Sequence, residues 1–525
     1  MGVATQILGL IASLSFLIIT HELGHFTFAK IFKTRVDQFY LFFNPGFSFI
    51  RFKRYDGKNH FSFFSGRAPK EWADHPESTE WGLGWLPLGG YCAINGMVDE
   101  TTKASDLSDE VHEWEFRAKP AWQRFFIIIG GVLVNFLSAI IIYIALCFTY
   151  GREYIPLENA KYGLEFSQEM QDAGFRNGDK ILLLNDYKPQ TLSDFANDIL
   201  LDDIKTVTVE RDGEQKVIRI PKSLPRKVVG AGTNSAFCNY RIPFVIDSVL
   251  PATPAARAGL MRGDSLVAVN DSATFCFFDY KKVFNENKGQ PVELAYYRGD
   301  SLCRSTVTLD SLGNIGVSYK LPYDYFGSVK EEYGFFESIP KGIVMGFQTL
   351  ADYVKQFKIV FTKEGSTQLG SFLTIGSIFP KTWDWERFWN MTALLGIILA
   401  FMNIIPIPAL DGGYILFILV EMITGKKPSD KFLGIANTIG FILLILLILS
   451  LTVCAAFGET LPEVTETEDY APETTETAAE DAGEEDAATE GTAEEAPAVQ
   501  LVPVLSYMPK LTAVAGTSYI ISTEK

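Results

Sequence analysis

The segment Ile18-Ile19-Thr20-His21-Glu22-Leu23-Gly24-His25 decides how this chain is interpreted. It lies in an apolar stretch, and a helix of about 20 apolar residues is long enough to cross a bilayer. His21 and His25 are one helical turn apart, so both imidazoles can reach one metal ion. Glu22 lies beside them and can take a proton from metal-bound water. Ionisable groups inside a membrane helix are costly, which favours a catalytic zinc site over a structural histidine pair.

Three further apolar stretches predict a polytopic α-helical membrane protein with four transmembrane helices. The predicted helices are residues 1–32, with the histidine motif, and residues 122–150, 391–421 and 430–457. The first stretch has no basic segment before it and no small-residue cleavage pattern, so we expect a retained helix and not a signal peptide.

Basic residues near the helix ends predict the orientation. The loop 33–121 is rich in Lys and Arg, and the short loop after the third helix carries Lys426, Lys427 and Lys431. Both loops are therefore expected in the cytoplasm. The segment between the second and third helices and the C-terminal tail would then be extracytoplasmic.

The net charge of −17 is concentrated at one place in the 525 residues. Residues 459–495 hold fifteen of the 63 acidic side chains and no Lys or Arg, and without them the net charge is −2. No basic face remains for nucleic acid, so a nucleic-acid partner is not expected. The segment 458–498 predicts a disordered acidic tail, whereas residues 499–525 receive no assignment.

The six cysteines are scattered and contain no C-x-x-C pair, which excludes a thiolate zinc cluster and a disulfide-stapled scaffold. Whether Cys238, Cys276 and Cys303 pair with one another stays open. Two histidines leave zinc short of its usual three protein ligands. The other three histidines, His60, His75 and His112, lie in the polar loop 33–121 and away from the membrane.

The extracytoplasmic segment contains an internal repeat. Residues 173–181, A-G-F-R-N-G-D-K-I, return 85 positions later as residues 258–266, A-G-L-M-R-G-D-S-L. The pattern resembles the PDZ family and predicts two tandem PDZ-like β/α domains at 155–228 and 240–325. PDZ domains bind an extended peptide at a sheet edge. The alternative is that both repeats are rigid spacers.

The third apolar stretch offers a further ligand. Asp411 is its only charge between Arg387 and Glu421, and Pro406, Pro408 and the pair Gly412-Gly413 break the helix around it. Irregular backbone at membrane depth is tolerated where it lines a protein cavity, and a metal compensates a carboxylate there. Asp411 is therefore the expected third zinc ligand. The alternative is a proline kink with an incidental acid.

Together, H-E-x-x-H in the first helix and N-x-x-P-x-P-x-L-D-G from Asn403 resemble the site-2 protease family of intramembrane zinc metalloproteases. Two PDZ-like repeats, the segment L-P-L-G-G-Y at 86–91 and Asn135 narrow the resemblance to members like the bacterial regulator of sigma E protease. The family usually shows Gly-Pro in place of Gly130-Gly131 and a basic residue in place of Cys92. These departures are expected to affect packing and loop detail and not the metal site.

The resemblance implies an activity and a set of roles. His21, His25 and Asp411 would bind Zn²⁺, Glu22 would act as the base, and Asn403 and Asn135 would hold substrate. The implied reaction is peptide-bond hydrolysis inside the membrane, acting on single-span membrane proteins such as anti-sigma factors or on remnant signal peptides. It further implies the bacterial inner membrane, PDZ domains that gate substrate access, and an upstream site-1-type protease that trims the same substrate.

Two surface segments are also expected to touch the lipid bilayer. Aromatic residues in 39–64 predict a β element on the membrane surface, which in the family is thought to present substrate as an extended strand; an anchor without that role is the alternative. The segment 333–390 has the apolar spacing of an interfacial helix. The rival functions are a non-catalytic scaffold and a transporter with Asp411 and His21 as a proton relay, which the intact motifs and the absence of repeated helices disfavour.

Overall fold

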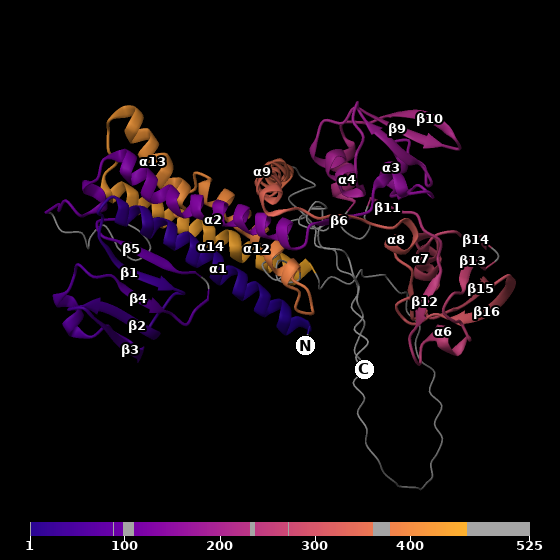
Figure 1. Ribbon diagram of the computed structural model, residues 1–525, viewed down its shortest axis with the longest axis horizontal. Helices are drawn as coiled ribbons and strands as arrows, with labels where there is room; N and C mark the ends of the chain where they lie inside the picture. Colours follow the sequence, from indigo (N-terminus) through magenta and orange to yellow (C-terminus); the bar gives the residue numbers. More distant parts are fainter. Residues whose placement is uncertain are drawn as a thin grey trace, which may run out of the picture.

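The computed structural model describes residues 2–87, 89–97, 110–231, 237–270, 272–360 and 378–458. The segment 499–525 and all but the first residue of the predicted tail 458–498 lie outside the described residues. Long helices form the centre of the molecule, with a five-stranded sheet at one end and two β/α units at the other (Figure 1).

Three helices in the described part of the chain have the length and hydropathy of membrane spans: α1 (Gly2–Ile31), α2 (Ala121–Thr149) and α12 (Trp385–Ile404). A fourth long helix, α14 (Asp430–Gly458), occupies the position of the last predicted span. Within the described residues, only its part Lys431–Leu443 counts as apolar helix. The chain is therefore a helical membrane protein, and the fourth span stays a prediction.

Glycines bring α1 and α2 into backbone contact. A Cβ atom added to Gly24 would lie 2.2 Å from the carbonyl oxygen of Gly130. Small residues allow such close approach of membrane helices, whose packing depends on van der Waals contact. At the end of the bundle away from the five-stranded sheet, α1, α2 and α12 share an apolar core that includes Leu10, Tyr143, Phe388 and Ile397. This packing holds the histidine motif against α2.

The predicted third span, 391–421, is two helices. α12 ends at Ile404, and α13 begins at Asp411 and runs to Thr424 (Asp411–Thr424). Proline has no backbone N–H and disfavours the helical conformation of the residue before it, so Pro406 and Pro408 end the first helix. Ala409 has a positive φ of 76° in the linking segment. The break places Asp411 at the first position of a new helix.

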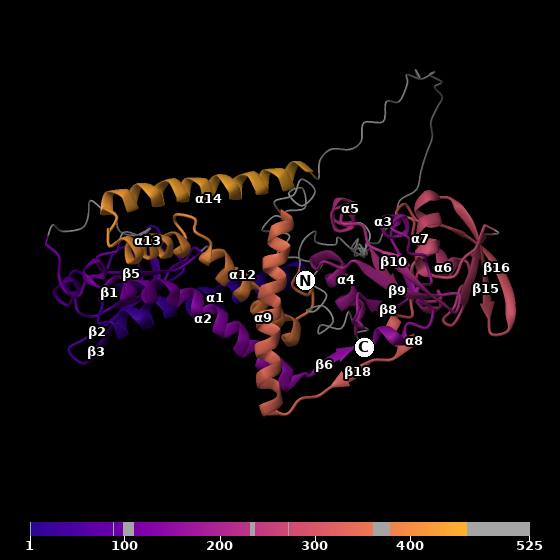
Figure 2. The same ribbon diagram turned by 90° about the horizontal axis from the view of Figure 1, so that it is seen from above.

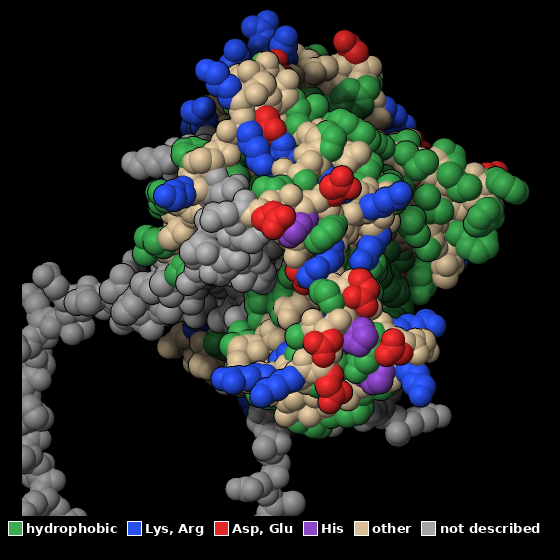
Figure 3. All heavy atoms as spheres, turned by 90° about the vertical axis from the view of Figure 1, so that its left-hand side faces the viewer, with side chains coloured by type: hydrophobic (Ala, Val, Ile, Leu, Met, Phe, Trp, Pro, Cys, Tyr) green, Lys and Arg blue, Asp and Glu red, His purple; other side chains and the backbone are tan. Residues whose placement is uncertain are grey.

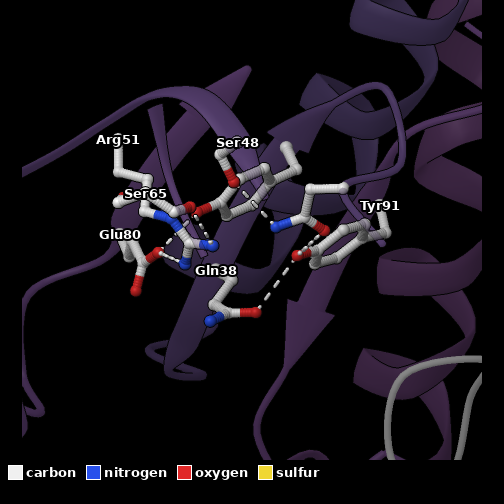
Figure 4. A network of polar contacts seen from close by, with 8 residues as sticks. Gln38, Ser48, Arg51, Ser65, Glu80 and Tyr91 are labelled. Carbon is white, nitrogen blue, oxygen red and sulfur yellow. Dashed lines mark hydrogen bonds and ion pairs between the residues drawn. The ribbon is translucent and has the colours of Figure 1, made fainter. Parts of the chain in front are cut away.

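The sheet that precedes α2 has the order β3-β2-β4-β1-β5, with β1 and β4 parallel and the other neighbours antiparallel. Its strands are β1 (Val36–Leu41), β2 (Ser48–Tyr55), β3 (Lys58–Ser65), β4 (Glu80–Leu83) and β5 (Tyr91–Ile94). A buried polar network links four of them (Figure 4): Arg51 donates to Glu80 at 3.1 Å, and Tyr91 donates to Gln38 at 3.3 Å. Buried ion pairs define one arrangement more than they stabilise it, so this network fixes the register of the sheet.

The first β/α unit has its own apolar core, centred on Phe175 and Phe195. Its strands form a three-stranded sheet, β10-β9-β8, and a separate pair, β11-β7. The elements are β7 (Leu164–Phe166), α3 (Gln168–Asp172), β8 (Lys180–Leu184), α4 (Leu192–Leu201), β9 (Thr206–Arg211), β10 (Glu214–Arg219), α5 (Leu224–Gly230) and β11 (Cys238–Tyr240).

The second unit, with a core around Phe244 and Tyr280, follows directly. It contains the sheet β14-β13-β15-β16 and the pair β12-β17. The elements are β12 (Ile246–Val249), α6 (Pro254–Arg257), β13 (Ser265–Val269), β14 (Ser272–Ala273), α7 (Phe277–Glu286), β15 (Pro291–Arg298), β16 (Ser301–Thr308), β17 (Val317–Tyr319) and α8 (Pro322–Phe326).

The sequence repeat is also a repeat of contacts. Arg211 donates to both carboxylate oxygens of Asp179 at 2.7 Å, and Arg298 donates to those of Asp264 at 2.9 and 2.7 Å. Both aspartates are 1% exposed. The shared G-D pattern thus places a buried aspartate that binds an arginine in each unit.

A short ribbon connects the two units to the helices. β6 (Arg152–Tyr154), directly after α2, pairs antiparallel with β18 (Val329–Glu331), directly before α9 (Phe335–Val360). α9 crosses α2 (Figure 2), and the rings of Phe136 and Phe347 lie 5.3 Å apart. The amphipathic segment predicted at 333–390 is thus a helix over its first half, and residues 361–377 lie outside the described set.

Candidate zinc centre

The histidine pair lies in the middle of the contact between α1 and α2. The Nε2 atoms of His21 and His25 are 3.2 Å apart, and the two rings meet edge to face. His25 is 7% exposed. The spacing of four residues brings the two Nε2 atoms together as predicted, so both can bind one metal ion.

Asp411 completes the group from the start of α13. Its Oδ2 atom lies 3.2 Å from Nε2 of His21 and 3.5 Å from Nε2 of His25. The two histidines and the aspartate are nearly 400 residues apart in sequence. The break between α12 and α13 is therefore what carries the carboxylate to the histidines.

These three atoms fit a tetrahedral zinc site. Zinc binds imidazole nitrogen and carboxylate oxygen at about 2.0–2.2 Å, and a tetrahedron of such bonds separates neighbouring donors by about 3.3–3.6 Å. The observed separations are 3.2, 3.2 and 3.5 Å. Three protein donors leave the fourth position for water or substrate, as in catalytic zinc sites.

A backbone contact orients one of the rings. The Nδ1 atom of His25 lies 2.9 Å from the carbonyl oxygen of Ile127 in α2. An N–H at Nδ1 that donates to this oxygen leaves Nε2 as the free lone pair directed at the metal position. His21 has no such partner for Nδ1 in the described part of the chain, although that atom is buried.

Gly131 corrects one expectation. The Gly130-Gly131 pair was expected to affect packing and not the metal site. A Cβ at Gly131 would lie 2.5 Å from Nε2 of His25 and 2.8 Å from Cε1 of His21. A side chain at this position requires the two rings to move, as the proline usual in the family also would, so Gly131 belongs to the wall of the site. Cys92, the other departure, is buried in β5.

The remaining predicted residues, Glu22, Asn135 and Asn403, are buried or half-buried in α1, α2 and α12. Glu22 is half-buried and directly follows His21 in α1. Asn135 is fully buried and accepts a hydrogen bond from Thr20 at 2.7 Å, which connects it to the residue before His21. Asn403 is half-buried in the last turn of α12. Substrate-binding roles for the two asparagines stay predictions.

The other histidines are elsewhere. His60 and His75 stack on the two faces of Tyr55 in the sheet region, with ring centroids 3.8 and 4.1 Å from the tyrosine. His112 stacks on Trp114 at 4.5 Å. Their ring contacts place them outside the zinc centre, as the sequence suggested.

Sequence reasoning overlooked Thr20, Ile127 and the direct contact of Gly131. A pair of glycines in an apolar helix does signal a close helix contact, but it does not say which helix comes close. A second acidic group, Glu165 with Cys276 and Asp279, was also missed, because it forms only where the two β/α units meet.

A helix bundle that presents two histidines and a carboxylate at tetrahedral spacing defines the class of membrane zinc metalloproteases. Comparison with known proteins agrees: residues 54–447, three quarters of the chain, match the model of peptidase family M50. The chain belongs to peptidase family M50, the site-2 protease family, and is a zinc metalloprotease. Asp411 lies inside the matched residues, and the histidine motif precedes them.

Relatives extend over nearly the whole chain. The regulator of sigma-E protease RseP of Escherichia coli K12 is 26% identical over 473 residues, 83% of this chain and 95% of its own length. Protease RseP of Yersinia pestis is 25% identical over 85% of this chain and 97% of its own. A Rickettsia conorii relative named as a zinc metalloprotease is 25% identical over 85% and 96%.

Among solved structures, a PDZ domain of an SdrC-like protein from Listeria monocytogenes aligns with 15% of this chain and 90% of its own. Its identity is 23% and its TM-score 0.14, which is too low to support an assignment.

Proposed function

We propose that this zinc metalloprotease hydrolyses peptide bonds at membrane depth, with His21, His25 and Asp411 as zinc ligands and Glu22 as general base. The observation that supports this ligand set is the group of three donor atoms 3.2–3.5 Å apart. Zinc in such a site lowers the pKa of bound water and polarises the scissile carbonyl. Glu22, on the same helix turn, takes the proton from the attacking water and returns it to the leaving amine.

Glu22→Gln tests the mechanism. The amide keeps the shape of the side chain but cannot accept the proton, so we expect full zinc content and no cleavage of a membrane-embedded peptide. Turnover at the parent rate would remove Glu22 from the mechanism. A zinc-loaded but inactive parent protein would instead favour the scaffold function.

The five-stranded sheet is proposed to present the substrate. A helix hides its carbonyl groups in its own hydrogen bonds, so a scissile bond must first be extended. A Cβ at Gly90 would lie 2.7 Å from Ile18, one turn before His21. The start of edge strand β5 therefore lies against α1 close to the zinc centre, which supports presentation of a substrate strand at this edge.

The opposite edge of the sheet has the character of a membrane contact. Phe61, Phe63 and Phe64 of β3 are 54%, 62% and 74% exposed. Figure 3 looks onto this end of the molecule, where charged side chains of both signs and histidines lie among hydrophobic and other side chains. Exposed aromatic rings on a β element fit the headgroup region of a bilayer.

The proposed location is the bacterial inner membrane, with the sheet in the cytoplasm and the two β/α units and the tail outside. Support comes from the basic loops and from the placement of sheet and units at opposite ends of the helices (Figure 1). The proposed substrates are single-span membrane proteins, of the anti-sigma-factor or remnant signal-peptide type, already trimmed by an upstream site-1-type protease. The two units, as PDZ-like domains, would exclude untrimmed substrate.

A further inference from the structure

One face of α2 carries the contacts that orient the zinc centre. Asn135 contacts Thr20, Gly131 lies against both histidine rings, and the carbonyl of Ile127 faces His25. These positions follow one another at steps of four residues, so they share a helix face. Arg124 is the next position on this face toward the end of the helix near the sheet.

Arg124 contacts α13. Its Nη2 atom donates to Oε1 of Glu421, and its Nε atom donates to the carbonyl oxygen of Lys119 at 2.9 Å. The arginine is 6% exposed. The ion pair therefore joins α2 to the last turns of the helix that begins with Asp411.

Asp411 and Glu421 are the two ends of one buried stripe of α13. Tyr414, Ile415 and Ile418 lie between them at helical spacing and pack on Ile127 and Ile128 of α2. Apolar contact is non-directional, so the middle of the stripe defines the rotation and depth of α13 less sharply than a directed polar contact does. A shift of one residue moves a helix by about 1.5 Å, which would take Asp411 out of reach of the metal position.

The ion pair is a costly way to hold two helices together. A buried pair contributes little to stability compared with apolar residues of similar size, and its better-supported use is to fix one register. The Oε2 atom of Glu421 is buried and has no hydrogen-bond partner among the described residues. A cavity of about 20 Å³ lined by Arg124, Glu421 and Lys427 has room for one water that could satisfy it.

We propose that Arg124 and Glu421 form a register lock that sets the depth and rotation of α13, and thereby the position of Asp411 at the zinc centre. The lock rests on the proposed role of Asp411 as a ligand. Arg124 and Glu421 are positioning residues, because they act on the metal through the helix that carries Asp411.

The test separates register from stability in the full-length chain, purified in detergent. Arg124→Met with Glu421→Met removes both charges and keeps the packing, so we expect an unchanged or higher melting temperature. Zinc affinity, measured by chelator competition, should fall about tenfold or more, as for other groups that orient metal ligands. The exchanged pair, Arg124→Glu with Glu421→Arg, should recover the parent affinity.

Ile418→Ala is the matched control. It opens a cavity in the same stripe, and should lower the melting temperature without weakening zinc binding. Parent-like zinc affinity in the double-methionine variant would overturn the lock, as would an affinity that follows the melting temperature across all variants. Asp411→Ala, measured alongside, distinguishes failure of the register lock from failure of the proposed ligand set. If this variant retains zinc, the ligand set itself is wrong.

Discussion

Gly131 of α2 stands where a side chain would touch His25 of α1: a Cβ there would lie 2.5 Å from the ring nitrogen that faces Asp411. The zinc centre is therefore bounded on one side by backbone alone. This close contact also lets the carbonyl of Ile127, one turn away, reach the other nitrogen of the same ring.

Gly131→Ala should therefore weaken zinc binding while the protein still folds. The two rings must shift to make room for the methyl group, as they must around the proline that the family usually carries at this position. The added methyl group occupies the space of the donor atoms, and both α1 and α2 resist moving because their backbones touch at Gly24 and Gly130. Zinc affinity measured by chelator competition reports the change. Leu133→Ala, on an exposed part of the same helix, is the control that should keep zinc. A zinc affinity equal to that of the parent would show that this contact does not hold the two rings in place.

The ligand set predicts which variants lose bound zinc and which keep it. His21→Ala, His25→Ala and Asp411→Ala should each reduce bound zinc well below one ion per chain, because two donors hold zinc poorly compared with three. His60→Ala should leave the content unchanged, since His60 stacks on Tyr55 outside the centre. If His60→Ala lost the metal while Asp411→Ala kept it, the assignment would have to be abandoned.

The buried pair in the second β/α unit predicts acid sensitivity. Burial disfavours the ionised form of Asp264, but hydrogen bonds from Arg298 and from the amide of Met261 outweigh it and lower the pKa of the carboxyl. The lowered pKa stabilises the folded unit at pH values above the ordinary pKa of the carboxyl, 3.8. This stabilisation disappears as the pH falls through the folded-state pKa. Asp264→Asn should make the unfolding of this unit less dependent on pH below about 4. Thermal melts between pH 2 and 6 measure the effect; an unchanged pH slope would count against it.

The gating role predicts how a change in the second unit affects cleavage. Gly263 has a φ of 90°, so Gly263→Val strains the turn by about 1–3 kcal/mol and weakens the unit without touching the zinc centre. If the units exclude long substrates, untrimmed substrate should now be cleaved and trimmed substrate should be cleaved at the parent rate.

The same variant distinguishes the alternative roles. Slower cleavage of trimmed substrate would mean that the units capture substrate, and no change in either rate would reduce them to spacers. Gly263→Asn is the matched control, because asparagine adopts a positive φ more easily than valine does.

The cysteines of the two units are free in the structure, which predicts a clear order of labelling. Burial raises the pKa of the Cys276 thiol to about 12, and the nearby Glu165 carboxylate adds to the rise. Cys276 should therefore resist maleimide at pH 8, and the half-exposed Cys303 should react first. Mass mapping of the labelled peptides gives the order. Faster labelling of Cys276 than of Cys303 would show that the contact between the units opens.

Local patterns in the sequence predicted most of the chemistry. The four-residue spacing of His21 and His25 places both side chains on one face of a helix. The prolines before Asp411 interrupt the helix. The repeat was visible because Asp179 and Asp264 occur in nonapeptides that share the pattern A-G-x-x-x-G-D.

Contacts between distant helices could not be predicted in the same way. Arg124 and Glu421 are 297 residues apart, and nothing in either local sequence says that the two meet. Gly131 looked like a packing residue, because its contact with His25 becomes known only when the packing of α1 against α2 is known.

The ribbon of β6 and β18 makes the segment between α2 and α9 a closed loop in the mechanical sense. Both ends of the two β/α units leave the helix bundle side by side, with Tyr154 opposite Val329. One further contact, the ion pair between Lys355 of α9 and Asp202, which directly follows α4, links the first unit back to the helices. Within the described residues, a load on either unit therefore reaches the helices through this ribbon and through the contact between α4 and α9.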